Sequence, residues 1–276
     1  EVLDAQARGT TGYAAIRPKQ FLALEIPLPP LAEQRRIVAR IEALAARVTE
    51  AQGLRREASE EAELLLAAQL KKIRHKLLES NYPKKKIGDI AQVTSGGTPS
   101  RDNPTYWGGD IPWIKTGELV DGDILNAEEH ITQEGMKNSS AKLFPPETIL
   151  VALYGQGQTR GRTARLMIEA TTNQACCVIL PTPEILESRF TQYWQRSLYY
   201  EMREKSHGGA QPNWNGSMIK NIEIALPPLE EQRRLVSYLD ELQAQVSKLR
   251  TAQGETAREL NALMPSVLDR AFKGEM

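Results

Sequence analysis

Apolar residues recur along two stretches of the chain at alternating intervals of four and three residues. In the first stretch they are Ile37, Ile41, Leu44, Val48 and Ala51, and in the second they are Leu235, Leu239, Leu242, Val246 and Leu249. This spacing gathers the apolar side chains into one narrow stripe on a helix, which is typical of a coiled-coil seam. The pattern therefore predicts two long helices, residues 29–81 and 227–276, packed antiparallel on each other.

Both predicted helices continue beyond the regular seam. Each passes a glycine, Gly53 or Gly254, and the second also contains Pro265, which we expect to kink it. A helix of roughly 45 residues is about 65–70 Å long, the length of about 20 base pairs of B-DNA.

The two helices begin with nearly the same sequence, because residues 26–38 match residues 224–236 at a constant offset. In each copy a proline pair ends an extended segment and presets the first helical φ, and an acidic residue follows in the first turn. A repeat of this length indicates one structural unit used twice. We interpret its polar residues as a junction between a domain and a helix; they are Glu33, Gln34, Arg35, Arg36, Glu231, Gln232, Arg233 and Arg234.

Residues 82–226, between the helices, show a different pattern. Short β-rich runs occur at 87–93, 111–115, 148–154, 163–168, 175–180 and 222–226, and one helix is predicted at 188–204. The sequence thus predicts an α+β protein, in which a mixed α/β globular domain is flanked by the two long helices. Residues 1–28 match the end of this domain, so we expect them to be the C-terminal remnant of a first copy, with residues missing before Glu1.

The overall composition is ordinary for a globular protein, with 41% hydrophobic and 25% charged residues. The formal net charge is zero, so any contact with nucleic acid must come from a local arrangement of basic groups. Cys176 and Cys177 lie in an apolar run and are interpreted as small buried hydrophobic residues on a strand. The three histidines lack metal-ligand spacing, and no membrane span or signal peptide is visible, so we expect no metal site and a cytoplasmic location.

The strongest candidate for DNA contact is the segment from Tyr154 to Thr163. It follows an apolar run, contains glycines and carries no acidic residue. Its amides Gln156 and Gln158 could pair with adenine, and its guanidinium groups Arg160 and Arg162 could pair with guanine or with phosphate. The alternative interpretation is a flexible polar turn with solvated charge.

Further candidates lie in other predicted loops. Gln211 and Asn213 could read bases or brace a loop, and the same two roles are open for Asn173 and Gln174. Lys115 and Thr116 could contact a phosphate or a base edge. The basic run 84–86 is either a phosphate contact or a solvated surface, whereas Trp107, Trp113 and Trp214 are expected in the core.

Several motifs together resemble one known family, the DNA specificity (S) subunits of type I restriction-modification systems. The resemblance covers essentially the whole chain, and no single motif carries it. The motifs are the Pro-Pro-Leu-x-Glu-Gln-Arg-Arg entry to each helix, Ser95-Gly96-Gly97-Thr98-Pro99-Ser100, Tyr106 to Trp113, Ala170 to Ala175, Gly208 to Asn213, and the closing Ala271-Phe272-Lys273-Gly274-Glu275.

The resemblance implies a non-catalytic subunit in which two target-recognition domains alternate with two spacer helices. Each domain would read half of a bipartite DNA site, methyltransferase (M) and restriction (R) subunits would be partners, and S-adenosylmethionine and ATP would bind to those partners. This chain departs from the pattern because it holds one complete recognition domain. It is either a fragment of a two-domain subunit or a half-subunit that associates with a second copy.

The sequence itself argues against catalysis in this chain. The proline pairs are followed by Leu31 and Leu229 instead of the aromatic residue that a DNA amino-methyltransferase places there to hold a flipped base, and no glycine-rich loop with a lysine is present to bind phosphates. No catalytic residue and no cofactor are therefore predicted. The alternative to DNA recognition is a coiled-coil adaptor that joins proteins without reading DNA.

Overall fold

A computed structural model describes residues 22, 28–155, 159–199 and 214–275. The chain divides into two compact units. One is Glu61–Ser247, and the other combines Glu1–Glu60 with Lys248–Met276. The predicted recognition domain lies inside the first unit, together with the adjoining part of each long helix.

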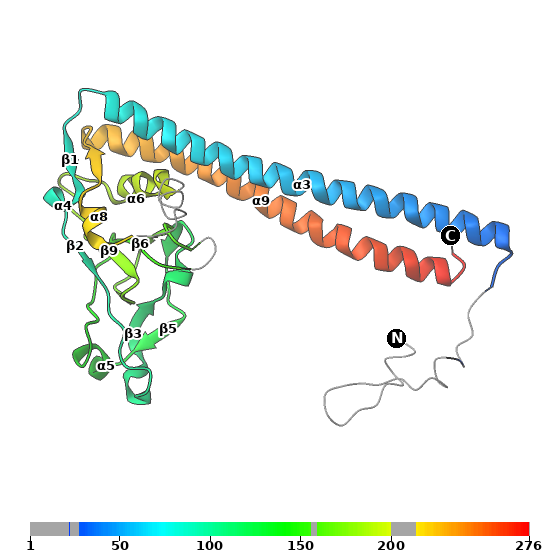
Figure 1. Ribbon diagram of the computed structural model, residues 1–276, viewed down its shortest axis with the longest axis horizontal. Helices are drawn as coiled ribbons and strands as arrows, with labels where there is room; N and C mark the ends of the chain where they lie inside the picture. The colour runs from blue at the N-terminus through cyan, green and yellow to red at the C-terminus, as the bar shows by residue number, and fades with distance from the viewer. Residues whose placement is uncertain (1–21, 23–27, 156–158, 200–213, 276) are drawn as a thin grey trace, which may run out of the picture. The chain divides into compact units, whose positions relative to one another are not determined.

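The two long helices are α3, Leu31–Glu79, and α9, Leu229–Phe272. In the unit Glu61–Ser247, Leu66 and Leu70 of α3 pack with Leu239 of α9. In the other unit, Gln52 Nε2 donates a hydrogen bond of 2.8 Å to Asn261 Oδ1. Early residues of α3 thus meet late residues of α9, which confirms the predicted antiparallel pair (Figure 1).

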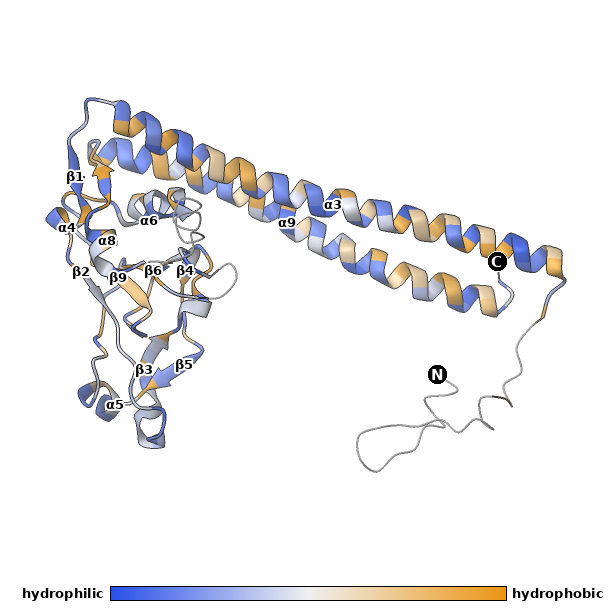
Figure 2. Cartoon of the chain, in the orientation of Figure 1, coloured by the Kyte–Doolittle hydropathy of each residue, from blue (hydrophilic) through white to orange (hydrophobic). Residues whose placement is uncertain are grey.

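The hydrophobic stripe accounts for only part of the apolar surface of these helices. Val48 and Leu239 are buried, as a seam requires, whereas Leu54, Leu64 and Leu65 lie more than half exposed. Figure 2 shows apolar and hydrophilic positions interspersed along both helices. Helix α9 continues through Pro265.

In the described part of the domain between the helices, the strands form three small sheets. The five-stranded sheet has the order β2-β9-β6-β7-β4, the three-stranded sheet β5-β3-β8, and the two-stranded sheet β1-β10. Their bounds are β1 Lys84–Lys86, β2 Val93–Ser95, β3 Trp107–Ile114, β4 Gly122–Ile124, β5 Glu129–Ile131, β6 Ile149–Ala152, β7 Thr163–Leu166, β8 Thr171–Thr172, β9 Cys176–Ile179 and β10 Glu223–Ala225. The short helices are α4 Ile87–Ile90, η1 Pro104–Tyr106, η2 Thr116–Glu118, α5 Gln133–Lys137, α6 Ser188–Ser197 and α8 Gly216–Lys220.

Five of the six predicted β runs contain a strand, and the run at 87–93 does not match its prediction. Most of it forms α4, a single turn closed by the hydrogen bond from Ala91 N to Ile87 O. This turn is fixed by tertiary contacts, since Ile87 N donates to Ile222 O and Gly88 lies against Lys220 of α8. The predicted helix at 188–204 is α6, which ends at Ser197.

The five-stranded sheet is buried on both faces. Ile149 and Val151 of β6 belong to a core that includes α6, α8 and the end of α3, while Leu150 belongs to a second core on the other face. The adjacent cysteines follow the same alternation, with Cys177 in the first core and Cys176 in the second. Both are free thiols buried on β9, as predicted. Burial raises the pKa of each thiol to about 12.

Candidate nucleic-acid interface

Strand register brings the ends of several strands to one edge of the domain. Ala152 at the end of β6 lies opposite Cys176 at the start of β9, and Val151 lies opposite Thr163 at the start of β7. The parallel pair β3-β8 ends at Ile114 opposite Thr172, from which the chain passes directly to β9. Segments that follow β3, β6 and β8 therefore leave the sheets at a common edge, here called the loop edge.

Seven of the eleven predicted DNA-contact residues are described, and all seven lie at the loop edge. The other four, Gln156, Gln158, Gln211 and Asn213, lie outside the described residues. The seven come from three segments that are far apart in the sequence; they are Lys115, Thr116, Tyr154, Arg160, Arg162, Asn173 and Gln174.

The segment from Tyr154 to Thr163 has a firmly bonded base. Ala152 N donates to Arg162 O and Gly161 N donates to Ala152 O, each at 2.8–2.9 Å. Gly161 has φ +83°, a left-handed conformation that favours glycine. Tyr154 is 39% exposed. Arg160 and Arg162 are half-buried. Arg160 Nε is buried and has no hydrogen-bond partner in the described part of the chain.

Asn173 and Gln174 brace this edge through their oxygen atoms. Asn173 Oδ1 accepts a hydrogen bond of 3.2 Å from Ala175 N, and Gln174 Oε1 accepts one from the hydroxyl of Thr98. A side-chain amide braced through its oxygen still carries two N–H donors that can face acceptors on a base or a phosphate. Bracing and DNA contact are thus compatible for these two residues.

The segment that carries Thr98 is held by close backbone packing. A Cβ atom added to Gly96 would lie 2.0 Å from Thr172 O, so only glycine fits there. Trp113 Nε1 donates a hydrogen bond of 2.9 Å to Gly97 O. Trp113 is buried, as predicted, and its ring meets that of Trp107 edge to face at 5.0 Å. The Gly-Gly-Thr motif therefore serves to fix the loop edge.

Lys115 is paired with acidic residues that the sequence analysis did not single out. Its Nζ lies 2.9 Å from Glu128 Oε2 and 2.9 Å from Glu129 Oε1, and Glu129 also binds Arg101 at 2.5 Å. Hydrogen bonds to Glu129 and then Glu128 raise the pKa of Lys115. Thr116, the first residue of η2, is half-buried beside it. Any phosphate that meets Lys115 must compete with two carboxylates.

The two junctions share a local design. Glu33 and Arg36 form a paired hydrogen bond of 2.9 and 2.6 Å, and Glu231 and Arg234 form the equivalent pair at 2.7 and 2.6 Å. Arg35 and Arg233 are exposed. These contacts stabilise the first turn of each helix.

The glutamines of the two junctions differ in their contacts. Gln34 Nε2 donates to Pro29 O at 2.8 Å. Gln232 is fully buried and makes the equivalent bond to Pro227 O, but its Nε2 also donates to Ile185 O and its Oε1 accepts from Glu187 N. Gln232 therefore fastens the recognition domain to α9.

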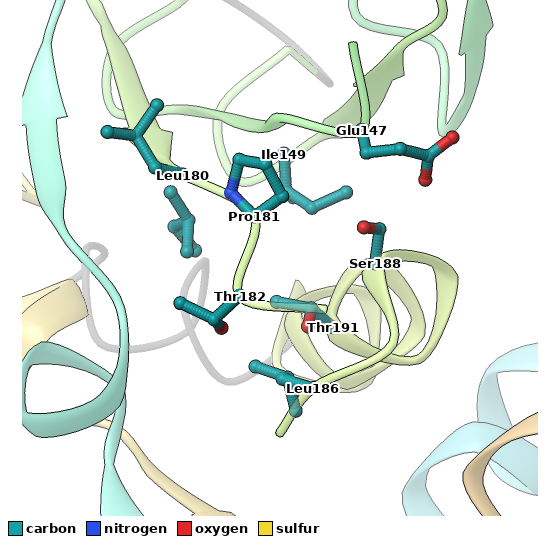
Figure 3. A pocket seen from close by; sticks show the side chains of 9 residues that line it. Glu147, Ile149, Leu180, Pro181, Thr182, Leu186, Ser188 and Thr191 are labelled. Carbon is teal, nitrogen blue, oxygen red and sulfur yellow. The ribbon is translucent and has the colours of Figure 1, made fainter. Parts of the chain in front are cut away.

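Two hollows in the unit Glu61–Ser247 differ greatly in size. A pocket under Pro181, next to α6, measures about 10 Å³, room for about one water molecule (Figure 3). A hollow of about 810 Å³ lies between the end of α3 and the start of α9, lined by Lys72, Lys76 and Tyr238 among others. Within the described ranges no cluster of residues could hold a metal ion.

Comparison with known proteins identifies the family. Residues 79–255 match the family profile "Type I restriction modification DNA specificity domain". The chain belongs to this family. The resemblance inferred from the motifs is thereby confirmed.

One individual member of the specificity family is similar to this chain over part of its length. The chain is 33% identical over 172 residues to the type I restriction enzyme MjaIX specificity subunit of Methanocaldococcus jannaschii, a match that covers 60% of this chain and 39% of that subunit. The chain thus spans well under two thirds of that relative's length.

Solved structures of the same family share the fold. A chain from a study of complex assembly and conformational transition of the type I R-M system superposes with a TM-score of 0.76 at 30% identity, covering 96% of this chain and 65% of that one. The HsdS subunit of Thermoanaerobacter tengcongensis gives a TM-score of 0.58 at 29% identity, covering 100% of this chain and 67% of that subunit. The predicted α+β architecture with two long helices is therefore confirmed. Among the helices described, none has the length and apolar content needed to cross a membrane.

Proposed function

We propose that this chain is a sequence-specific DNA-binding component of a type I restriction-modification complex. Its recognition domain, residues 82–226, reads one half of a bipartite site, and the helices 29–81 and 227–276 hold that domain at a set distance from the other half. One observation carries the proposal. In a chain of the specificity family, strand register gathers every described DNA-contact candidate at one edge of one domain.

The chemistry of the loop edge suits DNA. Guanidinium groups such as those of Arg160 and Arg162 pair with guanine O6 and N7 or with phosphate, and the amide N–H groups of Asn173 and Gln174 suit base acceptors. Each good bidentate base contact discriminates by roughly 1–3 kcal/mol. The loop edge thus supplies both positioning and base-reading groups.

The proposal assigns catalysis to other subunits. The chain supplies position, while M subunits hold S-adenosylmethionine and R subunits hold ATP, and no catalytic, metal or cofactor site is assigned here. The partners are double-stranded DNA, M and R subunits, and a second copy of the chain if it acts as a half-subunit. The protein would act in the cytoplasm, where the DNA of a bacterium or archaeon lies.

A binding experiment on the full chain tests the proposal. Genomic methylation gives the target motif, and gel-shift or anisotropy titrations at moderate salt then compare the target duplex with a scrambled duplex, with the M subunit present. We expect clear preference for the target, and Arg160→Ala should weaken target binding by roughly 1–3 kcal/mol if this arginine reads a base. An equal loss on both duplexes would mark it as a phosphate contact.

Two outcomes would overturn the proposal. Equal affinity of the wild-type chain for target and scrambled duplexes would support a coiled-coil adaptor that joins proteins without reading DNA. Methyl transfer to DNA by the purified chain alone would show an enzyme instead of a recognition component.

A further inference from the structure

Helix α6 is attached to α9 along one face. Arg189 Nε donates to Asp240 Oδ1 at 2.9 Å, and Tyr193 Oη donates to the same oxygen at 2.5 Å. One turn further, Arg196 Nη2 donates to Gln243 Oε1 at 2.8 Å. Intervals of four and three residues place these side chains on one side of α6, which lies alongside α9 in this unit (Figure 1).

Arg196 also reaches the base of the segment that carries Arg160 and Arg162. Its Nε lies 3.9 Å from Asp121 Oδ1, an ion-pair distance. The same oxygen accepts hydrogen bonds from Thr163 N at 2.9 Å and from Thr163 Oγ1 at 3.1 Å. Asp121 N donates in return to Thr163 O at 2.8 Å. Asp121 therefore binds Thr163, the last residue of the Tyr154–Thr163 segment, through three hydrogen bonds, here called the Asp121–Thr163 clasp. Arg196 forms an ion pair with the Asp121 oxygen of this clasp.

The charge of Arg196 is buried, and a gain in stability is not the general reason for burying a charge. The Arg196 side chain is 12% exposed, and its Nη1 is buried without a hydrogen-bond partner among the residues that the structure describes. Burial lowers the pKa of Arg196, although an arginine remains charged at neutral pH. Replacing buried ion pairs by apolar residues of similar volume is often neutral or stabilising, so a buried pair is by itself weak evidence of a contribution to stability.

We propose that Arg196 is a positioning residue that connects α9 to the base of the DNA-reading segment. Arg196 contacts Gln243 of α9 on one side and the Asp121–Thr163 clasp on the other. Within the unit Glu61–Ser247, these contacts set the direction in which the loop edge faces relative to α9. Arg196 is a determinant of specificity that does not itself contact DNA. The inference rests on the proposed function, since it requires that the segment reads DNA.

Arg189 offers a matched control on the same helix. It is the same residue type, two turns earlier, and it too is bonded to α9 through Asp240. Its carboxylate partner in the sheet is Asp123, at 2.7 Å, and Asp123 in turn binds Arg165 within β7. Loss of Arg189 thus weakens the attachment of α6 to α9 and to Asp123 but removes no direct contact with Asp121 or Thr163.

The test compares Arg196→Met with Arg189→Met in the full chain, with the M subunit present. For Arg196→Met we expect the ratio of target to scrambled affinity to fall about tenfold or more, comparable to the cost of a mismatched base pair, while scrambled binding stays within about twofold. Arg189→Met should keep the ratio within about threefold. Hydrogen exchange at the Thr163 amide should also accelerate in Arg196→Met. The acceptor of this amide is Asp121 Oδ1, which loses its ion pair with Arg196 in the variant.

A second variant covers the case in which Arg196→Met does not fold. Asp121→Asn keeps an oxygen that can accept from Thr163 but removes the charge that faces Arg196, so it should lower the ratio as well. In the double variant the losses should be less than additive, because both changes break one connection. Additive losses would contradict the proposal.

The outcomes separate this inference from the proposed function. If the wild-type chain itself fails to distinguish target from scrambled duplex, the proposed function is wrong. If the wild-type chain distinguishes them and Arg196→Met does so equally well, with Thr163 equally protected, only the positioning role is overturned.

Discussion

At the scale of single residues, the buried amide of Gln232 makes the sharpest energetic prediction. Its substitution by alanine leaves Glu187 N without its acceptor, and it removes the donor of the buried Pro227 carbonyl and of the Ile185 carbonyl. An unsatisfied buried polar group costs about 1–3 kcal/mol. We therefore expect Gln232→Ala to lower the free energy of unfolding by at least about 1–3 kcal/mol in urea titrations.

The repeat supplies the control for this prediction. Gln34 occupies the matching position and is half-buried, and its described hydrogen bond is the one to Pro29 O. Gln34→Ala should cost less than about 1 kcal/mol. Equal losses from the two variants would show that the glutamine acts only within its own helix start, and that Ile185 and Glu187 contribute nothing.

The two thiols give a chemical prediction. Because burial raises the pKa of Cys176 and of Cys177 to about 12, both remain protonated and shielded at pH 8. A disulfide reagent such as DTNB should label neither thiol in the native chain and both in denaturing urea. Rapid labelling of the native chain at pH 8 would show that β9 opens or lies at the surface.

The junction also shows where sequence reasoning ends at this scale. The repeat predicts that Gln34 and Gln232 share a local role, and both do bond the carbonyl of the first proline in their pair. The extra bonds of Gln232 go to the turn at Ile185–Glu187, which is far away in the sequence. A contact of that kind depends on the tertiary fold, so the repeat alone cannot show it.

At the scale of elements, strong local periodicity predicts better than weak patterns. The apolar patterns of the long helices and of the buried strands β6 and β9 predict the secondary structure that these segments adopt in the fold. The one-turn helix α4 has an apolar run suited to a strand, but contacts with Ile222 and Lys220 decide its conformation. The loop edge shows the same limit. Its amide and guanidinium groups could be chosen because they lie in loops that follow predicted strands, but the pairing of Lys115 with Glu128 and Glu129 depends on the tertiary fold.

Those acids lead to a prediction for the element around β5. The carboxylates of Glu128 and Glu129 form ion pairs with the Lys115 ammonium group, so they compete with any phosphate for that group. The double variant Glu128→Gln/Glu129→Gln should therefore bind target and scrambled duplexes more tightly by a similar factor, most strongly at low salt. The measurement is a pair of anisotropy titrations at low and high salt.

Acidic residues elsewhere on the domain provide the comparison. Glu134→Gln in α5 removes charge from a helix that does not carry Lys115 or its partners, and it should change affinity much less. If tighter binding were confined to the target duplex, the acids would act on base recognition instead of on phosphate attraction.

At the scale of the whole molecule, a net charge of zero means that any affinity for DNA must come from a local arrangement of cations. The loop edge holds Arg160 and Arg162, while the basic run of β1 lies elsewhere. Strand β2 runs from Val93 opposite Ile179 to Ser95 opposite Cys177, so it ends at the loop edge. Strand β1 comes before β2 in the chain and pairs with β10, on the side away from that edge.

This arrangement predicts the salt dependence of binding. Each phosphate contact adds about 0.9 to the slope of log K against log salt concentration. Arg160→Gln/Arg162→Gln should therefore reduce that slope by about 1–2 if these side chains meet phosphates, whereas Lys84→Gln/Lys85→Gln, which removes the same charge from β1, should leave it unchanged. Anisotropy titrations from about 50 to 200 mM salt measure both slopes. A reduced slope in the lysine variant would place the DNA along β1 and contradict the assignment of the loop edge, because each double variant removes two positive charges and the slope falls only where those charges meet phosphates.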